Sequence, residues 1–201
     1  MSDPVIDAAP GAEASSSARR RRLAPLIVGV IGALMVGLLL VLVGASPDDG
    51  GAVADSPLIG RPAPEATGTL SDGTAFDLSR RKGSWVALNF FDPTCVPCIR
   101  EHPELVAFAA DQATLGTDGA ELYSVITRGE PEEIEAFFAD NGGDWPAIYS
   151  AADEFPVAFG VAQVPETWII DPSGVVQLRL ISEITAEQLN SILRQFREQY
   201  G

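Results

Sequence analysis

The longest run of apolar positions lies near the N-terminus of the chain. Residues 23–43 contain no charged side chain, and an α-helix of about twenty residues is long enough to cross the roughly 30 Å hydrocarbon layer of a bilayer. The arginines Arg19 to Arg22 precede this run, and Asp48 and Asp49 follow it. By the positive-inside rule, the pattern predicts one transmembrane helix with a cytoplasmic N-terminus and everything after it outside the cell membrane.

A cleaved secretory signal peptide is the alternative interpretation of the same segment. Small residues at Val43, Gly44 and Ala45 are of the kind that a signal peptidase accepts. The apolar run is longer than the usual 7–15 residues of a signal peptide, and 22 residues precede it, so we favour an uncleaved anchor. Either interpretation places the rest of the chain on the extracytoplasmic, periplasmic side.

The flanking segments differ from the apolar run in composition. Residues 1–22 are Ala, Ser, Pro, acidic residues and the arginines, without hydrophobic periodicity, and are expected to be a disordered cytoplasmic tail. Residues 44–57 are rich in Gly, Ala, Asp, Ser and Pro and are expected to be a flexible linker. A folded extracytoplasmic domain is therefore expected over residues 58–201.

Within this domain, strand-like and helix-like patterns alternate. Alternating or continuous apolar runs bounded by turn residues predict strands, and apolar positions spaced three and four apart predict helices. The predicted strands are 67–70, 74–78, 85–91, 121–127, 167–171 and 175–181, and the predicted helices are 95–115, which Pro103 interrupts, 131–141 and 185–200. Strands 67–70 and 74–78 flank an Asp-Gly turn, and Thr185 with Gln188 forms a capping box. The order predicts an α/β fold with a mixed central sheet and an N-terminal β-hairpin extension.

Composition narrows the chemistry that this fold can support. The chain has 13 Lys and Arg against 28 Asp and Glu, a net charge of −15, whereas a nucleic-acid surface needs clustered cations. One histidine and two cysteines exclude a disulfide-stapled scaffold, a zinc site of four thiolates and a two-histidine metal centre. We therefore expect no nucleic-acid partner, no cofactor and no metal, and the chemistry must involve the cysteine pair.

Cys95 and Cys98 form a Cys-x-x-Cys pair where a buried strand ends and a helix begins. The N–H groups and positive dipole of a helix N-terminus stabilise a thiolate. Cys95, in the first turn, is thus expected to be the exposed attacking group and Cys98 the more buried resolving thiol. A static disulfide is an alternative, but its small loop would stabilise the fold little. A metal site would need more ligands than two thiolates and His102.

Two segments resemble a known family, the TlpA/ResA/CcmG (DsbE) branch of thioredoxin-like proteins. The matching residues are Val86-Ala87-Leu88-Asn89-Phe90-Phe91, Cys95-Val96-Pro97-Cys98, Arg100-Glu101-His102-Pro103, Val164-Pro165-Glu166-Thr167, Ile169-Ile170-Asp171 and Gly174. The resemblance implies a thioredoxin fold, usually behind an N-terminal membrane anchor, and thiol–disulfide exchange with protein substrates outside the membrane. It often implies reduction of apocytochrome c cysteines before haem attachment, with electrons from a membrane thiol carrier.

The resemblance also assigns residues by position. It makes Cys95 the nucleophile and Cys98 its resolving partner in a redox-active disulfide, and it makes Pro165 a cis-proline beside the site. Glu101 matches an acidic residue near the cysteine pair, where a carboxylate changes thiol acidity or relays a proton. The alternative for Pro165 is an ordinary loop proline, and the alternative for Glu101 is a solvated helical glutamate. Thr94 departs from the tryptophan that the family usually has before the first cysteine.

Two other functions remain open at this point. A peroxiredoxin would use one cysteine against peroxide, but the spacing P-x-x-x-[ST]-x-x-C is absent because Leu88 and Asp92 occupy the required positions before Cys95. A copper carrier would keep both thiols reduced and hold Cu(I). The sequence therefore favours a membrane-tethered thiol–disulfide oxidoreductase over both.

Overall fold

A computed structural model describes residues 27–39, 51–150 and 154–200 of the chain. The chain divides into two compact units, Met1–Pro47 and Asp48–Gly201. In the first unit, residues 27–39 form a helix with exposed side chains. Among the described residues, no helix combines the length and the apolar character needed to cross a bilayer. The predicted tail 1–22 lies outside the described residues, as do both ends of the predicted span 23–43.

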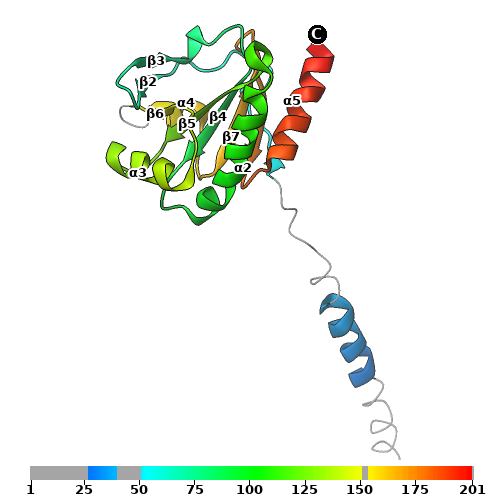
Figure 1. The fold of residues 1–201 in the computed structure, drawn as a ribbon. Helices are drawn as coiled ribbons and strands as arrows, with labels where there is room; N and C mark the ends of the chain where they lie inside the picture. Colours follow the sequence, from blue (N-terminus) through cyan, green and yellow to red (C-terminus); the bar gives the residue numbers. More distant parts are fainter. Residues whose placement is uncertain (1–26, 40–50, 151–153, 201) are drawn as a thin grey trace, which may run out of the picture. The chain divides into compact units, whose positions relative to one another are not determined.

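The second unit is built around one mixed sheet with the order β1-β8-β7-β4-β5-β6-β2-β3 (Figure 1). Neighbouring strands are parallel in the pairs β4–β5 and β5–β6 and antiparallel elsewhere. Both faces of the central strand β4 are buried along its whole length, as its continuous apolar run indicates. The strands are β1 (Ala52–Val53), β2 (Thr67–Leu70), β3 (Ala75–Asp77), β4 (Val86–Phe91), β5 (Glu121–Ile126), β6 (Ala147–Tyr149), β7 (Glu166–Ile170) and β8 (Val176–Ile181).

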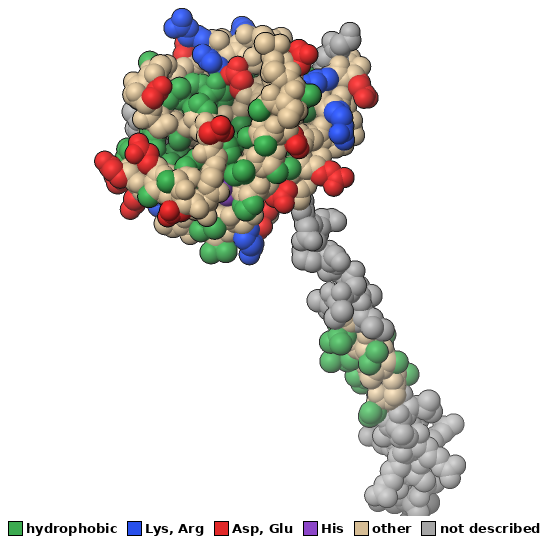
Figure 2. Space-filling model, in the orientation of Figure 1, with side chains coloured by type: hydrophobic (Ala, Val, Ile, Leu, Met, Phe, Trp, Pro, Cys, Tyr) green, Lys and Arg blue, Asp and Glu red, His purple; other side chains and the backbone are tan. Residues whose placement is uncertain are grey.

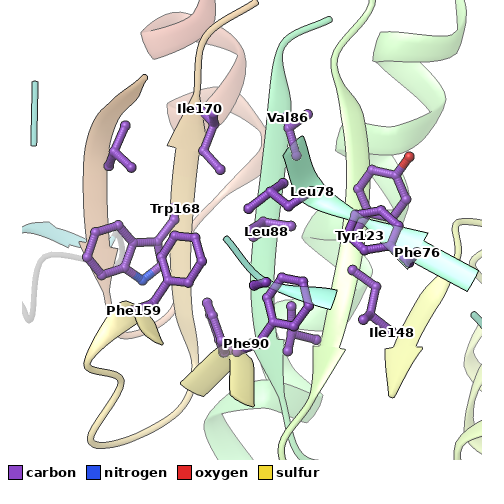
Figure 3. Close-up of a cluster of buried hydrophobic side chains, with 14 residues drawn as sticks. Phe76, Leu78, Val86, Leu88, Phe90, Tyr123, Ile148, Phe159, Trp168 and Ile170 are labelled. Atoms are coloured by element: carbon purple, nitrogen blue, oxygen red, sulfur yellow. The ribbon is translucent and has the colours of Figure 1, made fainter. Parts of the chain in front are cut away.

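Helices cover both faces of this sheet. The helical elements are η1 (Leu78–Arg80), α2 (Val96–Ala113), η2 (Gly116–Asp118), α3 (Pro131–Asn141), α4 (Glu154–Phe159) and α5 (Ala186–Tyr200). On one face, Leu105 of α2 and Leu189 of α5 pack with Ala87 and Ile169 of the sheet. On the other face, Phe159 of α4 packs against Phe90 and Trp168, and Phe76 of β3 packs against Tyr123 of β5, as Figure 3 shows. The predicted α/β fold with a mixed sheet is confirmed.

Helix α2 differs from its prediction at Pro103. The sequence predicts an interruption there, but the helix continues through the proline to Ala113. Proline removes one backbone hydrogen bond, which a helix tolerates when the flanking turns are held by packing. Cys98 and Leu105, on the two sides of Pro103, are both buried. The prediction of an interruption is therefore wrong.

The N-terminal end of this unit differs from the expected flexible linker over 44–57. Strand β1 pairs Ala52 with Ile181 of β8, and Ala54 N donates to Arg179 O at 3.0 Å. Gln188 Nε2 donates to Gly51 O at 2.7 Å. The predicted capping box therefore forms only in part: Thr185 Oγ1 accepts from Gln188 N at 3.2 Å, while the Gln188 side chain binds Gly51. The linker prediction is wrong from residue 51 onward, because composition does not show that a free edge of β8 will accept a short strand.

Strand β6 and helix α4 are also absent from the predicted elements. Strand β6 extends the sheet beyond β5 and also pairs with β2, which joins the predicted hairpin to the central sheet. Helix α4 lies in the connection to β7 and buries Phe155 and Phe159. With three and six residues, these elements are too short for a hydrophobic period to be recognised.

Candidate active site

Both cysteines lie at the carboxyl end of β4, where the chain turns into α2. The turn is fixed by Asp92, whose Oδ1 accepts hydrogen bonds from Thr94 N and Thr94 Oγ1, both at 2.7 Å. Cys95 N donates to Asp92 O at 3.1 Å. Cys95 is the N-cap residue of α2, so its sulfur lies at the positive end of the helix dipole.

The two thiols have different environments. Cys95 is partly exposed, whereas Cys98 is fully buried. Cys98 N donates to Cys95 Sγ at 3.4 Å, so the sulfur that faces solvent receives a backbone hydrogen bond. Burial raises the pKa of the Cys98 thiol, and its contact with Cys95 raises it further. The geometry is that of an accessible sulfur with a protonated partner one helical turn inward.

The Val164–Pro165 peptide bond is cis, as the family resemblance implied. The loop lies against the cysteine pair although it is 69 residues away in sequence, and Cys95 Sγ donates to Val164 O at 3.5 Å. On its other side, Pro165 O accepts from Ser182 N at 3.1 Å. Unlike an ordinary loop proline, Pro165 is buried and has a cis peptide bond, and the residue before it contacts Cys95.

Glu101 lies one helical turn after Cys98 and is only 1% exposed. Its carboxyl accepts hydrogen bonds from Asn89 Nδ2 at 3.0 Å and from Ile184 N at 3.1 Å. Burial raises the pKa of Glu101 to about 8, although both hydrogen bonds act in the opposite direction. The structure thus excludes the solvated glutamate and places a buried carboxyl one helical turn after Cys98.

The sequence did not predict the ion pair between Arg179 and Glu166, the buried residue that follows the cis-proline. Glu166 is 1% exposed and accepts from Arg179 Nε and Nη2, both at 2.9 Å, and from Trp168 Nε1 at 2.6 Å. A bidentate pair of this geometry holds the residue after Pro165 in place. In the sequence, Arg179 alternates with apolar residues of the predicted strand 175–181, a pattern typical of a solvent-facing position.

His102, on the helix that follows the cysteines, is 1% exposed inside an aromatic cluster. Its Nε2 lies 2.7 Å from Gly142 O, and Phe137, Phe138 and Trp145 surround the ring. Burial lowers the pKa of His102. Among the described residues, no group of three or more His, Cys, Asp or Glu side chains is placed to hold a metal ion.

A pocket of about 710 Å³ opens beside the cysteine loop and is lined in part by Asp92, Arg128, Val157 and Val164. The pocket shares Asp92 with the turn that positions Cys95 and Val164 with the cis-proline loop. Arg128 is exposed, and its Nη1 lies 3.6 Å from Asp92 Oδ2. The pocket therefore lies between the Asp92 turn and the loop that precedes the cis-proline.

A mixed thioredoxin-like sheet with a Cys-x-x-Cys pair opposite a cis-proline defines a thioredoxin-fold thiol–disulfide oxidoreductase. The chain belongs to the AhpC/TSA family, whose pattern matches residues 59–179.

Named relatives agree with this class. The chain is 30% identical to thiol:disulfide interchange protein HelX of Rhodobacter capsulatus over 135 residues, which cover 65% of this chain and 72% of HelX. It is 29% identical to thiol-disulfide oxidoreductase ResA of Geobacillus thermodenitrificans over 143 residues, which cover 69% and 78% of the two chains. The resemblance seen in the sequence is confirmed, and the chain is a thiol–disulfide oxidoreductase.

Solved structures support the fold. The thioredoxin domain of a thiol-disulfide oxidoreductase from Bacteroides vulgatus superposes with a TM-score of 0.60 at 22% identity, covering 70% of this chain and 99% of that domain. A secreted thiol-disulfide isomerase from Corynebacterium glutamicum superposes with a TM-score of 0.61 at 22% identity, covering 74% of this chain and 92% of the isomerase chain.

Proposed function

We propose that the reduced Cys95–Cys98 pair transfers two electrons to a protein disulfide. The Cys95 thiolate attacks one substrate sulfur, the substrate S–S bond breaks, and the other substrate sulfur leaves as a thiolate. Cys98 then loses its proton and attacks Cys95 Sγ in the mixed disulfide. The bond between Cys95 Sγ and the substrate breaks, the substrate sulfur that was bound to Cys95 leaves as a thiolate, and the Cys95–Cys98 disulfide forms. The observation that carries this proposal is the accessible Cys95 sulfur next to a buried Cys98 at the start of α2.

Glu101 is the proposed acceptor of the Cys98 proton. A buried carboxyl with a pKa of about 8 exchanges protons near neutral pH, which suits a general base better than an ordinary glutamate does. Cys98 needs such a base because its own pKa is raised by burial. In the reverse direction, the same carboxyl returns the proton when the disulfide is reduced.

Pro165 is the proposed substrate-positioning residue. Its loop holds the Val164 backbone against Cys95, where an extended substrate segment can pair with it as an added strand. Such pairing needs an unfolded or flexible cysteine-bearing segment. Apocytochrome c before haem attachment has this character, and we propose it as a substrate on the basis of the family resemblance.

We further propose that residues 23–43 anchor the domain in the cell membrane, with tail 1–22 in the cytoplasm and domain 58–201 outside. The arginine run before the apolar segment supports this orientation. One of the solved structures with this fold is described as secreted. An extracytoplasmic pair needs a source of electrons, for which we propose a membrane thiol carrier.

Fractionation of cells that express the full chain tests the anchor. The chain is expected in the membrane fraction and resistant to extraction at high salt, whereas a chain starting at Asp48 is expected in the soluble fraction. If expression of the full chain instead yields a soluble protein of reduced mass, a cleaved signal peptide is supported.

Peroxide reduction is the second candidate, although the peroxiredoxin spacing is absent before Cys95. Such an activity needs one cysteine only. If the Cys98→Ala chain still turned over peroxide, the peroxide function would be favoured. A Cu(I) carrier would instead yield stoichiometric copper after anaerobic purification.

Covalent trapping tests the proposed exchange. The full chain with Cys98→Ala is expected to accumulate a mixed disulfide through Cys95, because the resolving sulfur is absent. The matched control is the Cys95→Ala/Cys98→Ala double variant, which should trap nothing. If Cys98→Ala traps no protein, and the intact chain shows no exchange with a peptide disulfide, the proposed roles are wrong.

A further inference from the structure

Three buried polar side chains form a row across the centre of the sheet. Asn89 of β4 lies opposite Thr167 of β7 and Ser124 of β5 in the strand registers. Each of the three is at most 1% exposed. Because alternate strand residues share a face, Asn89 points to the same side as Ala87, which packs in the cluster with α2. The row therefore lies beneath α2, where Glu101 also points inward.

Asn89 connects this row to Glu101. One Nδ2 hydrogen donates to Glu101 Oε2 at 3.0 Å, and Nδ2 also donates to Thr167 Oγ1 at 3.1 Å. The amide oxygen, Asn89 Oδ1, is buried and has no hydrogen-bond partner among the described residues. An unpaired buried acceptor is costly, so a native structure that retains one has a reason for it.

Building on the proposed role of Glu101, we propose that Asn89 is the positioning residue that lets this carboxyl gain and lose a proton. An amide carries both a donor and an acceptor. The Asn89 N–H donates to the Glu101 carboxylate, and after the amide turns by half a rotation Oδ1 accepts the O–H of the carboxylic acid. Thr167 Oγ1, which accepts from Asn89 Nδ2 before the turn, can donate its hydrogen to Asn89 Oδ1 after it, because a hydroxyl both accepts and donates.

The other groups that face Glu101 do not provide this alternation. Ile184 N can only donate. Glu183, in the same loop, disfavours the carboxylate, and it is itself paired with Arg100 of α2. Cys98, one turn before Glu101, is the source of the proton.

Two further polar groups of these elements have partners of their own. Glu104 accepts from Ala186 N, and Ser124 accepts from Trp145 Nε1. Among the amide and backbone groups that the structure describes around Glu101, only Asn89 can pair with both protonation states without bringing a charge of its own.

The test is a direct titration of Glu101 in the reduced full chain, by NMR of ¹³C-labelled glutamate carboxyls. The Glu101→Gln variant identifies the resonance. Replacing Asn89 by Ala removes a donor to the carboxylate, so the Glu101 inflection is expected to move up by about one pH unit. Asn89→Asp is isosteric and places two carboxyls in contact, which should share one proton and raise the inflection further.

Ser124→Ala is the matched control, because it removes a buried polar group of the same row that binds Trp145 and not Glu101. It should lower stability and leave the Glu101 inflection in place. Thr167→Val provides a second variant at the other end of the Asn89 amide, and it should shift the inflection in the same direction as Asn89→Ala.

The proposal is overturned if Asn89→Ala and Asn89→Asp leave the inflection at its wild-type pH, or if Ser124→Ala moves it equally. The outcome is independent of the proposed function, since Glu101 titrates whether or not the chain exchanges disulfides. In the exchange reaction, the pH midpoint of the Cys98 resolving step should move with the NMR inflection across the variants.

Discussion

Glu101 makes proton exchange and stability depend on the same side chain. The folded protein holds its carboxyl in a buried site that raises the pKa to about 8, against a reference value of 4.5. Below pH 4.5 the group is protonated in both the folded and the unfolded chain. Between pH 4.5 and 8 only the unfolded chain ionises, so the stability that the neutral carboxyl contributes is lost over this window.

The Glu101→Gln variant should therefore gain stability relative to the wild type as pH rises from 4.5 to 8. The difference is expected to grow by a few kcal/mol and to stay constant above pH 8, since each pH unit between the folded and unfolded pKa values corresponds to about 1.4 kcal/mol. Urea unfolding of both reduced chains at several pH values measures this. A difference that does not change with pH would contradict the buried titration.

His102 should make the fold sensitive to acid. Burial lowers its pKa below the reference value of 6.5, so the contribution of the neutral ring is complete above pH 6.5 and is lost as pH falls through the folded pKa. His102→Gln keeps a donor for Gly142 O and removes the titration. Its unfolding midpoint should fall less than that of the wild type between pH 7 and 5, and parallel curves would contradict this.

Residues with a local motif could be predicted, and residues that depend on distant partners could not. The spacing of Cys95 and Cys98 and the position of Pro165 in a family motif were sufficient to place them in the sequence. Asn89 and Glu166 also lie in the matched segments, but their contacts depend on partners on other elements, Glu101 and Arg179. Because no periodicity marks a polar side chain that will be buried and paired, these two residues required the structure.

Among the elements, long segments were predicted closely. The predicted helix 131–141 matches α3, Pro131–Asn141. The strand predictions differ from the structure by one residue at one end for β4, β5 and β8, and by one residue at each end for β7. These segments have a clear hydrophobic period or a continuous apolar run. The two-residue strand β1 depends on backbone hydrogen bonds to β8, which side-chain patterns do not encode.

The junction between the hairpin and the central sheet depends on Gly68. A Cβ at this position would lie 2.7 Å from Tyr149 O and 2.8 Å from Ile148 Cγ2 of β6. Gly68→Ala should therefore force β2 away from β6 and destabilise the fold by about 1–3 kcal/mol. Thr69→Ala, at the exposed neighbouring position, should change stability by less than about 0.5 kcal/mol in the same denaturation experiment. Equal effects of the two substitutions would contradict the close strand contact.

The whole molecule carries a strongly negative field. The net charge is −15, and acidic side chains are spread over the visible face of the second unit in Figure 2. A field of this sign attracts cationic partners and repels anionic ones over distances comparable with the Debye length. Substrate choice is therefore expected to depend on charge as well as on the local contacts at Cys95.

Exchange rates with charged peptide disulfides should show this dependence. At low ionic strength, a cationic peptide is expected to react about tenfold faster than an anionic peptide of the same length, and the ratio should approach one near 1 M salt. A neutral peptide serves as the control and should respond little to salt. A ratio that does not change with salt would mean that local contacts alone set the preference.

Strand β1 also determines where the preceding chain joins the domain. Ala52 pairs with Ile181, and Ile181 pairs with Glu166, the residue after Pro165. The chain therefore joins the second unit at the end of the sheet that carries the cysteines, whereas α5 starts near that end and runs away from it to the C-terminus (Figure 1). A reporter protein or purification tag fused at the C-terminus would leave Cys95 open to large substrates, and the same tag placed directly before Gly51 would obstruct it.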